Sequence, residues 1–231
     1  NIGFVLLCAA FVFVMTPGLA MFYGGLVRKK NVVNTMMTSI FIIGVGIVMW
    51  VLFGYSLSFA PSGNAFIGDF RWLGLEGVSL TEGYTDDASI PNMVFSAFQM
   101  MFAVITPALI TGAVAGRMKF KSIFVFTIFW SLIVYYPLAH MVWGQGGLLG
   151  ADGIGALDFA GGDVVHISSG VSALVLCILL GKRHDYEHSI YRIHNIPTVV
   201  LGASLLMFGW FGFNAGSALA ADGLAAHAFM T

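Results

Sequence analysis

Charged residues are scarce in this chain. Asp, Glu, Lys and Arg together make up 9% of its 231 residues, whereas about 25% is usual for soluble domains. Hydrophobic residues reach 58%, against about 45–50% in soluble domains. A water-soluble globule is therefore excluded. Intrinsic disorder is excluded as well, because Phe alone contributes 21 residues.

A surplus of basic residues, a cysteine framework and catalytic motifs are also lacking. Ten Lys and Arg residues face eleven Asp and Glu, so no positive excess is present to bind a nucleic acid. Cys8 and Cys177 lie far apart in apolar runs, which argues against a disulfide framework or a metal pair. No nucleophile–base pair or paired carboxylate stands on an element that would hold it. We expect no enzyme activity, no metal and no cofactor.

Stretches without charge organise the chain, because a membrane helix needs about 20 mostly apolar residues. The expected spans are 3–27, 35–60, 92–116, 122–140, 160–181 and 195–219. A further apolar segment starts at 224 and stops at residue 231, which indicates the first turns of another helix in a longer chain. The prediction is an all-α polytopic membrane protein, with residues 1–231 forming part of a single membrane domain.

The basic residues predict the orientation. Nine of the ten Lys and Arg residues follow the first, third and fifth expected spans. Loops rich in Lys and Arg stay on the cytoplasmic side. The loop 61–87 carries five acidic residues and only Arg71 as a cation. We therefore expect a multi-pass protein of the cell membrane with its N-terminus outside.

One segment combines a carboxylate with an intramembrane imidazole. Asp158 lies at the mouth of the fifth expected span, and His166 lies inside it. Charge at the bilayer centre costs about 2.5–3.5 kcal/mol, so ionisable residues there usually face a cavity or a partner. If a helix continues from Asp158, His166 follows about two turns and roughly 12 Å later, facing the same channel. Two alternatives stay open: His166 as a hydrogen bond between helices, and Asp158 as a helix cap.

Aromatic residues cluster near the expected span ends. Phe98 and Phe102 are four residues apart and share a helix face, as Trp210 and Phe213 nearly do at three apart, while Trp143 follows the fourth span. Taken singly, each is better explained by packing or by an interfacial belt. Aromatic faces also attract cations by about 0.5–2 kcal/mol. A recruiting site for a small positive ion is the functional alternative.

Several segments together resemble the ammonium transporter family, which includes the Rhesus-type proteins. They are MFYGGLVRKKN from Met21, AFQMMFA from Ala97, HMVWGQGG from His140, DFAGGDVVHISSG from Asp158 and GWFGFNAGS from Gly209. The resemblance extends over essentially the whole chain. It implies a homotrimer of eleven-helix protomers, each with its own pore and an inverted repeat. This chain would supply about six helices and the start of a seventh.

The resemblance also implies roles for particular residues. In that family an outer site recruits ammonium, a gate lies below it, and a histidine-lined hydrophobic pore follows. Carried over by position, the outer site comprises Trp143, Phe102, Ser217 and Phe98, the gate Phe102 and Phe213, the pore His166 and Trp210, and the structural support Asp158. A second pore histidine belongs to a region that this chain does not reach.

A physical argument favours deprotonation during transport. Moving a small cation into a low-dielectric medium costs on the order of 20 kcal/mol in the Born limit, and a cation–π contact of about 2 kcal/mol cannot offset that. An imidazole in the apolar section can take part in a proton relay. We therefore expect ammonia to pass the pore with the proton on a separate route.

Two further expectations follow from the resemblance. Some family members are ammonium sensors that signal without significant flux, which is the alternative function. Others are regulated from the cytoplasm by a PII-type protein, and the loop Lys182–Arg192 is a candidate landing surface for it.

Overall fold

The computed structural model describes residues 1–61, 64–151, 153–183, 186 and 190–231. Across these residues the chain is helical, and its extended pairing is confined to an isolated bridge between Gly83 and Pro91. The main helices, in chain order, are α1 (Ile2–Leu26), α2 (Val32–Met49), α3 (Tyr55–Phe59), α4 (Asn92–Val114), α5 (Phe120–Trp130), α6 (Tyr136–Trp143), α7 (Ser168–Leu180), α8 (Ile196–Gly216) and α9 (Gly223–Met230).

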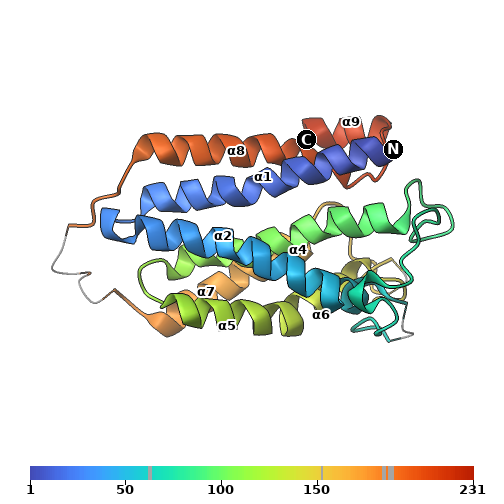
Figure 1. The fold of residues 1–231 in the computed structure, drawn as a ribbon, viewed down its shortest axis with the longest axis horizontal. Coiled ribbons are helices and arrows are strands. Elements are labelled where there is room, and N and C mark those ends of the chain that lie inside the picture. The colour runs from blue at the N-terminus through green and yellow to red at the C-terminus, as the bar shows by residue number, and fades with distance from the viewer. Residues whose placement is uncertain (62–63, 152, 184–185, 187–189) are drawn as a thin grey trace.

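Within the described ranges, six helical stretches are long and apolar enough to cross a membrane. They are Ile2–Leu26, Lys29–Phe59, Asn92–Val114, Phe120–Trp143, Gly162–Leu180 and Ile196–Gly216. They run back and forth along one common axis, and α9 turns back beside the N-terminus (Figure 1). The expected all-α polytopic architecture is confirmed.

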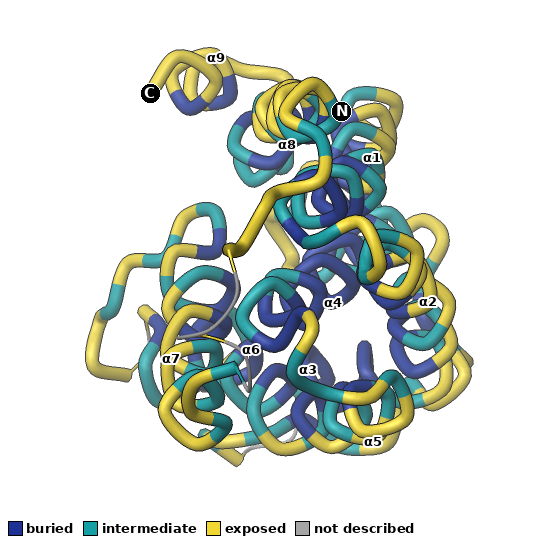
Figure 2. The backbone as a smooth tube through the Cα atoms, turned by 90° about the vertical axis from the view of Figure 1, so that its left-hand side faces the viewer, coloured by how far each residue is buried: buried dark blue, intermediate teal, exposed yellow. Residues whose placement is uncertain are grey.

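Helix α4 forms the centre of the bundle. It packs against α1, α2 and α7, and the end-on view shows it enclosed by its neighbours (Figure 2). Of its most apolar 18-residue window 72% is buried, compared with 22% for the corresponding windows of the fifth and sixth stretches. Side chains on α4 are therefore best placed to form the wall of an internal site.

Glycines bring α1 and α8 into close contact. A Cβ on Gly202 would overlap the backbone at Phe22, and one on Gly212 would lie 2.7 Å from the Cβ of Phe11. A Cβ on Gly216 would lie 2.7 Å from the Cβ of Cys8. Small residues at four-residue spacing let helix backbones approach in this way. The spacing of Gly212 and Gly216 thus serves helix packing.

Some helix ends differ from the sequence expectation. The fourth stretch continues to Trp143, three residues beyond the expected end. A π-helical turn at Ser131–Tyr135 precedes Pro137 and accommodates the missing N–H of that proline. The sixth stretch ends at Gly216 rather than at 219, because Leu219 takes a left-handed conformation with φ of 58°.

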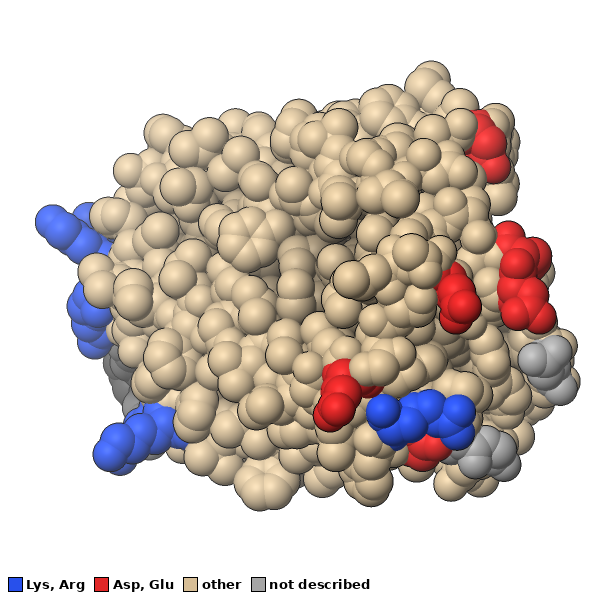
Figure 3. All heavy atoms as spheres, turned by 45° about the vertical axis from the view of Figure 1, so that its right-hand side comes forward, with Lys and Arg blue, Asp and Glu red and all other residues tan. Residues whose placement is uncertain are grey.

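Charge is separated between the two ends of the bundle. Figure 3 shows basic groups at one end and acidic groups toward the other. We refer to the end with Arg28, Arg117 and Arg183 as the basic end and to the opposite end, where the N-terminus lies (Figure 1), as the acidic end. Arg71 belongs to the acidic end and pairs with Asp69 at 2.8 Å.

Candidate functional site

A pocket of about 240 Å³ opens at the acidic end of the bundle. One wall comes from consecutive turns of α4, which contribute Phe95, Gln99 and Phe102. Trp143, the last residue of α6, lies beside them. The remaining wall includes Ser217 from the turn after α8, together with Tyr84, Thr85, Asp158, Phe159 and Leu219. We call this space the aromatic pocket.

Phe102 connects the aromatic pocket with the helix core. Its ring meets the Trp143 ring edge-on, with centroids 6.0 Å apart. Phe98 lies on the other side, 4.9 Å from Phe102. Phe98 is fully buried and does not line the pocket, and its ring packs close to Gly216. It therefore supports the Phe102 ring from behind.

Asp158 holds Trp143 in position. The indole N–H of Trp143 donates to the Asp158 backbone carbonyl at 2.9 Å. The two carboxylate oxygens of Asp158 accept four backbone N–H groups, from Gly161, Gly162, Asp163 and Val164, at 2.5–3.0 Å. These are the unpaired donors of a helix N-terminus, so Asp158 is a helix cap.

The continuous helix considered between Asp158 and His166 is not formed. Gly161 has φ of 94°, and regular helical structure begins at Gly162 with a π-helical turn to Ile167. The chain turns sharply there because a glycine readily adopts positive φ. The angular relation calculated from a straight helix therefore does not apply, and the capping alternative for Asp158 is confirmed.

Ser217 terminates α8 at the edge of the aromatic pocket. Its hydroxyl donates to the Phe213 carbonyl at 2.8 Å, which leaves the oxygen lone pairs free to accept. The following turn is held by Ser89, whose hydroxyl donates to the Leu219 carbonyl at 2.6 Å. Asn1 also accepts from the Ala221 N–H at 3.0 Å. The position of Ser217 is thus fixed from two sides.

Phe213 lies directly behind Phe102. The two ring centroids are 4.4 Å apart, and each side chain is 1% exposed. This close contact separates the aromatic pocket from the space beyond. Two tilted rings in such close contact can form a barrier that opens by rotation of side chains, without movement of a helix.

His166 and Trp210 follow beyond Phe213. The His166 ring lies 5.8 Å from the Phe213 ring and stacks on Trp210 at 5.2 Å, with an interplanar angle of 11°. His166 is half-buried, whereas Trp210 is 41% exposed. The structure thus brings together Trp143, Phe102, Phe213, His166 and Trp210 in one series of neighbouring rings.

The model of the Ammonium Transporter Family matches residues 3–231, nearly the entire sequence. The chain belongs to the ammonium transporter family. The ammonium transporter of Bacillus subtilis is 53% identical over 227 residues, covering 98% of this chain and 54% of that protein. This chain therefore spans about half the length of the curated relatives it matches.

Solved structures of ammonium transporter family members share this fold. The crystal structure of Saccharomyces cerevisiae Mep2 has a TM-score of 0.89 at 38% identity, covering all of this chain and 51% of that one. A structure described as a sensor Amt protein has a TM-score of 0.84 at 30% identity, covering 98% of this chain and 56% of its own.

Six residues that line the aromatic pocket of this ammonium transporter family chain were not among the site residues expected from the sequence, and they include Gln99 and Tyr84. Gln99 shares a helix face with Phe95 and Phe102, and a long amide side chain between these two aromatic positions was the available signal. Tyr84 lies in an irregular loop, which has no periodicity to reveal its inward position. Burial raises the pKa of Tyr84 to about 12, so its phenol stays neutral at physiological pH.

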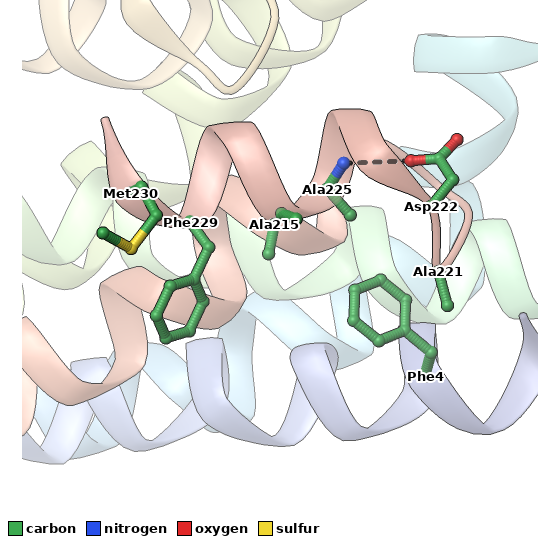
Figure 4. Close-up of a pocket in the computed structure, with 8 residues that line it drawn as sticks. Phe4, Ala215, Ala221, Asp222, Ala225, Phe229 and Met230 are labelled. Carbon is green, nitrogen blue, oxygen red and sulfur yellow. Dashed lines mark hydrogen bonds between the residues drawn. The ribbon is translucent and has the colours of Figure 1, made fainter.

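Another hollow, of about 420 Å³, lies between α1, α8 and α9. Figure 4 shows Phe4, Ala215, Phe229 and Met230 around it, with Asp222 at its edge. The Asp222 carboxylate caps α9 by accepting from the Ala225 N–H at 2.9 Å. The hollow is otherwise apolar and lacks the paired aromatic faces of the aromatic pocket. Among the residues that the structure describes, no cluster of metal-binding side chains is found.

Proposed function

We propose that this chain forms six of the membrane helices of an ammonium transmembrane transporter. Its family membership and six membrane-capable helices support this proposal. The charge separation supports an orientation in the cell membrane with the basic end in the cytoplasm and the N-terminus outside. The aromatic pocket then opens to the outside, where ammonium is taken up as a nitrogen source.

The series of ring contacts from Trp143 through Phe102 and Phe213 to His166 carries the mechanistic part of the proposal. Ammonium is recruited in the aromatic pocket against the Phe102 and Trp143 rings, with Ser217 accepting a hydrogen bond from it. Phe98 and Asp158 keep these groups in place. Acidic residues around the pocket mouth raise the local cation concentration.

The gate and the histidine then separate the proton from the nitrogen. Phe102 and Phe213 leave no polar passage between their rings, so a hydrated cation is excluded at this point. His166 exchanges the proton, since a neutral imidazole has one donor and one acceptor. Ammonia passes along His166 and Trp210, while the proton follows a separate route. Potassium cannot lose a proton, and the same step therefore provides selectivity.

Replacement of His166 by Asp tests this mechanism in proteoliposomes containing the full-length protein. Ammonium should evoke charge movement in the wild-type protein, and potassium should not. His166→Asp should reduce or abolish this discrimination, because a fixed carboxylate attracts either cation. Unchanged selectivity in the variant would contradict the proton relay.

An ammonium sensor is the second candidate function, favoured by the likeness to the sensor Amt protein. A sensor would use the same aromatic pocket but would carry no significant flux. Ammonium binding without ammonium-evoked current would support the sensor. Binding together with current would support the transporter.

Family membership also supports a homotrimer and regulation by a PII-type protein at the basic end. The loop Lys182–Arg192 is the proposed landing surface, although residues 184–185 and 187–189 lie outside the described part of the chain. Native mass measurement of the purified protein tests the trimer. Co-purification with a PII-type protein, before and after Lys182→Ala and Arg192→Ala, tests the surface.

A further inference from the structure

Gln99 places an amide in the wall of the aromatic pocket. Its side chain is 9% exposed, and its oxygen is buried without a hydrogen-bond donor in the described structure. A buried acceptor without a donor is unfavourable, because it has lost its contact with water. Gln99 lies one turn from Phe95 and one turn from Phe102, both of which line the same pocket.

Three other polar groups around the pocket are already used, whereas the Ser217 hydroxyl oxygen, like Gln99, keeps acceptor capacity. Each carboxylate oxygen of Asp158 accepts two backbone N–H groups, which occupies about four acceptor positions of a carboxylate. The Trp143 indole N–H donates to the Asp158 backbone carbonyl. The Tyr84 hydroxyl oxygen accepts from the Gln145 N–H at 3.0 Å. Gln99 therefore differs from these groups in keeping an unused acceptor.

The amide can present this acceptor to a bound ion. Rotation about its terminal bond exchanges the oxygen with the nitrogen, and the two positions are nearly equal in shape. A cation in the pocket favours the orientation in which the oxygen faces it. The aromatic faces themselves attract any small cation, whether or not it has N–H groups.

We propose that the side-chain oxygen of Gln99 accepts a hydrogen bond from a cation in the aromatic pocket and thereby selects cations that carry N–H groups. This inference rests on the proposed binding of ammonium at that pocket. A site built to hydrogen-bond its substrate rejects an analogue that lacks the donor, since a buried polar group then stays unpaired. Gln99 is thus a specificity-determining residue, while Phe102 and Trp143 supply attraction without this distinction.

The test compares two cations on purified full-length protein by calorimetry. Ammonium carries four N–H groups, and tetramethylammonium carries none. Gln99→Leu keeps a similar volume and removes the acceptor, and Gln99→Met is a second variant should the first fail to fold. Trp143→Leu is the matched control, because it removes an aromatic face and keeps the amide.

Gln99→Leu should weaken ammonium binding about tenfold, the effect of one hydrogen bond to a charged group. Binding of tetramethylammonium should change by less than about twofold, because the aromatic faces are intact. Trp143→Leu should weaken the binding of both cations. Gln99→Glu, which restores an acceptor and adds charge, should recover ammonium binding at least to the wild-type level.

Equal ammonium affinity in wild type and Gln99→Leu would overturn the inference. An equal loss of affinity for ammonium and for tetramethylammonium would also overturn it. Absence of ammonium binding to the wild-type protein would overturn it together with the aromatic site. The proposed transport function fails by a different result. Wild-type protein that binds ammonium but gives no ammonium-evoked current in proteoliposomes would reject transport, while the Gln99 comparison by calorimetry would still decide the inference.

Discussion

The two ends of the bundle both present aromatic rings, but they differ in what lies against them. At the basic end, the guanidinium groups of Arg28 and Arg183 lie over the Tyr191 ring, 5.0 and 4.7 Å from its centroid. At the acidic end, the rings of Phe102 and Trp143 face the aromatic pocket. Within the described residues, every contact of Lys or Arg with a ring face belongs to the basic end.

This difference explains why one aromatic cluster is a candidate cation site and the other is not. A ring face covered by a side-chain cation already makes a cation–π contact, and this contact stabilises the fold. A ring face in a pocket without such a cation is available to a substrate. The surrounding charges act in the same direction, since acidic residues at one end attract small cations and basic residues at the other repel them.

The largest expected effect comes from removing the cap that holds the acidic-end site together. Asp158→Ala leaves four backbone N–H groups of one helix start without their acceptor. We expect a loss of about 3 kcal/mol in the free energy of unfolding, as for hydrogen bonds to a charged group, and loss of ammonium binding because Trp143 is no longer positioned. Thermal unfolding in detergent measures the first, and calorimetry measures the second.

Asp158→Asn is the matched control, because its amide keeps one oxygen and so retains part of the cap. Its stability should fall between wild type and Asp158→Ala. Equal stability of all three proteins would show that the four contacts do not secure the helix start. Loss of binding in Asp158→Asn at full stability would instead indicate that the carboxylate charge acts on the cation directly.

Trp143→Leu should have the next largest effect. It removes one of the two rings proposed to hold ammonium and should weaken ammonium recruitment by up to about 2 kcal/mol, the upper range of a desolvated cation–π contact. The apparent affinity from ammonium-evoked currents measures this change. An unchanged affinity would remove Trp143 from the recruitment site and would abolish the distinction between the two ends.

The architecture of this chain is more readily predicted from its sequence than the site is. The apolar stretches around α1, α4 and α8 predict membrane helices, because a helix that crosses the lipid must be mostly apolar over about 20 residues. The resemblance pointed to Trp143 and Phe102, which the fold brings into contact. The continuous helix considered from Asp158 is not formed, because the conformation of Gly161 changes the path of the chain, and helical structure begins at Gly162.

The missed features depend on contacts between distant segments. Tyr84 enters the pocket through a loop, and the Gln145 contacts that hold it lie 61 residues away in sequence. The role of Gln99 becomes visible only when its neighbours on other helices are known to be hydrogen-bonded already. A single sequence contains the residue types at these positions but no direct signal of which of them meet.

Tyr191→Leu provides the basic-end counterpart of Trp143→Leu. The ring is partly exposed and lies against two guanidinium groups, so its removal should reduce the free energy of unfolding by about 1 kcal/mol. Ammonium affinity should not change. Thermal unfolding and ammonium-evoked current measured on the same preparation test both statements, and a large loss of affinity would mean that this ring also serves the substrate.

The smallest effect is expected from Asp69→Asn, which frees the Arg71 guanidinium at the acidic end. Arg71 donates a side-chain hydrogen bond to Asp69 and thereby lowers the pKa of that carboxyl. Because the pKa is depressed, the ion pair stabilises the fold above the unfolded pKa of about 4, and this contribution disappears as the pH falls through the folded value. The Arg71 side chain is exposed and that of Asp69 is partly exposed, so the contribution is small.

At neutral pH Asp69→Asn should therefore lower the melting temperature slightly, and the difference from wild type should vanish in acid, at a pH below the lowered pKa of Asp69. Ammonium affinity should fall by less than about twofold, and only at low salt, because an exposed charge beyond about 10 Å is screened at moderate ionic strength. A large, salt-independent loss would mean that Arg71 reaches the aromatic pocket once Asp69 is neutral. The ring faces at the acidic end would then be free of side-chain cations for two reasons: few cations lie there, and the ion pair with Asp69 keeps Arg71 away from the rings.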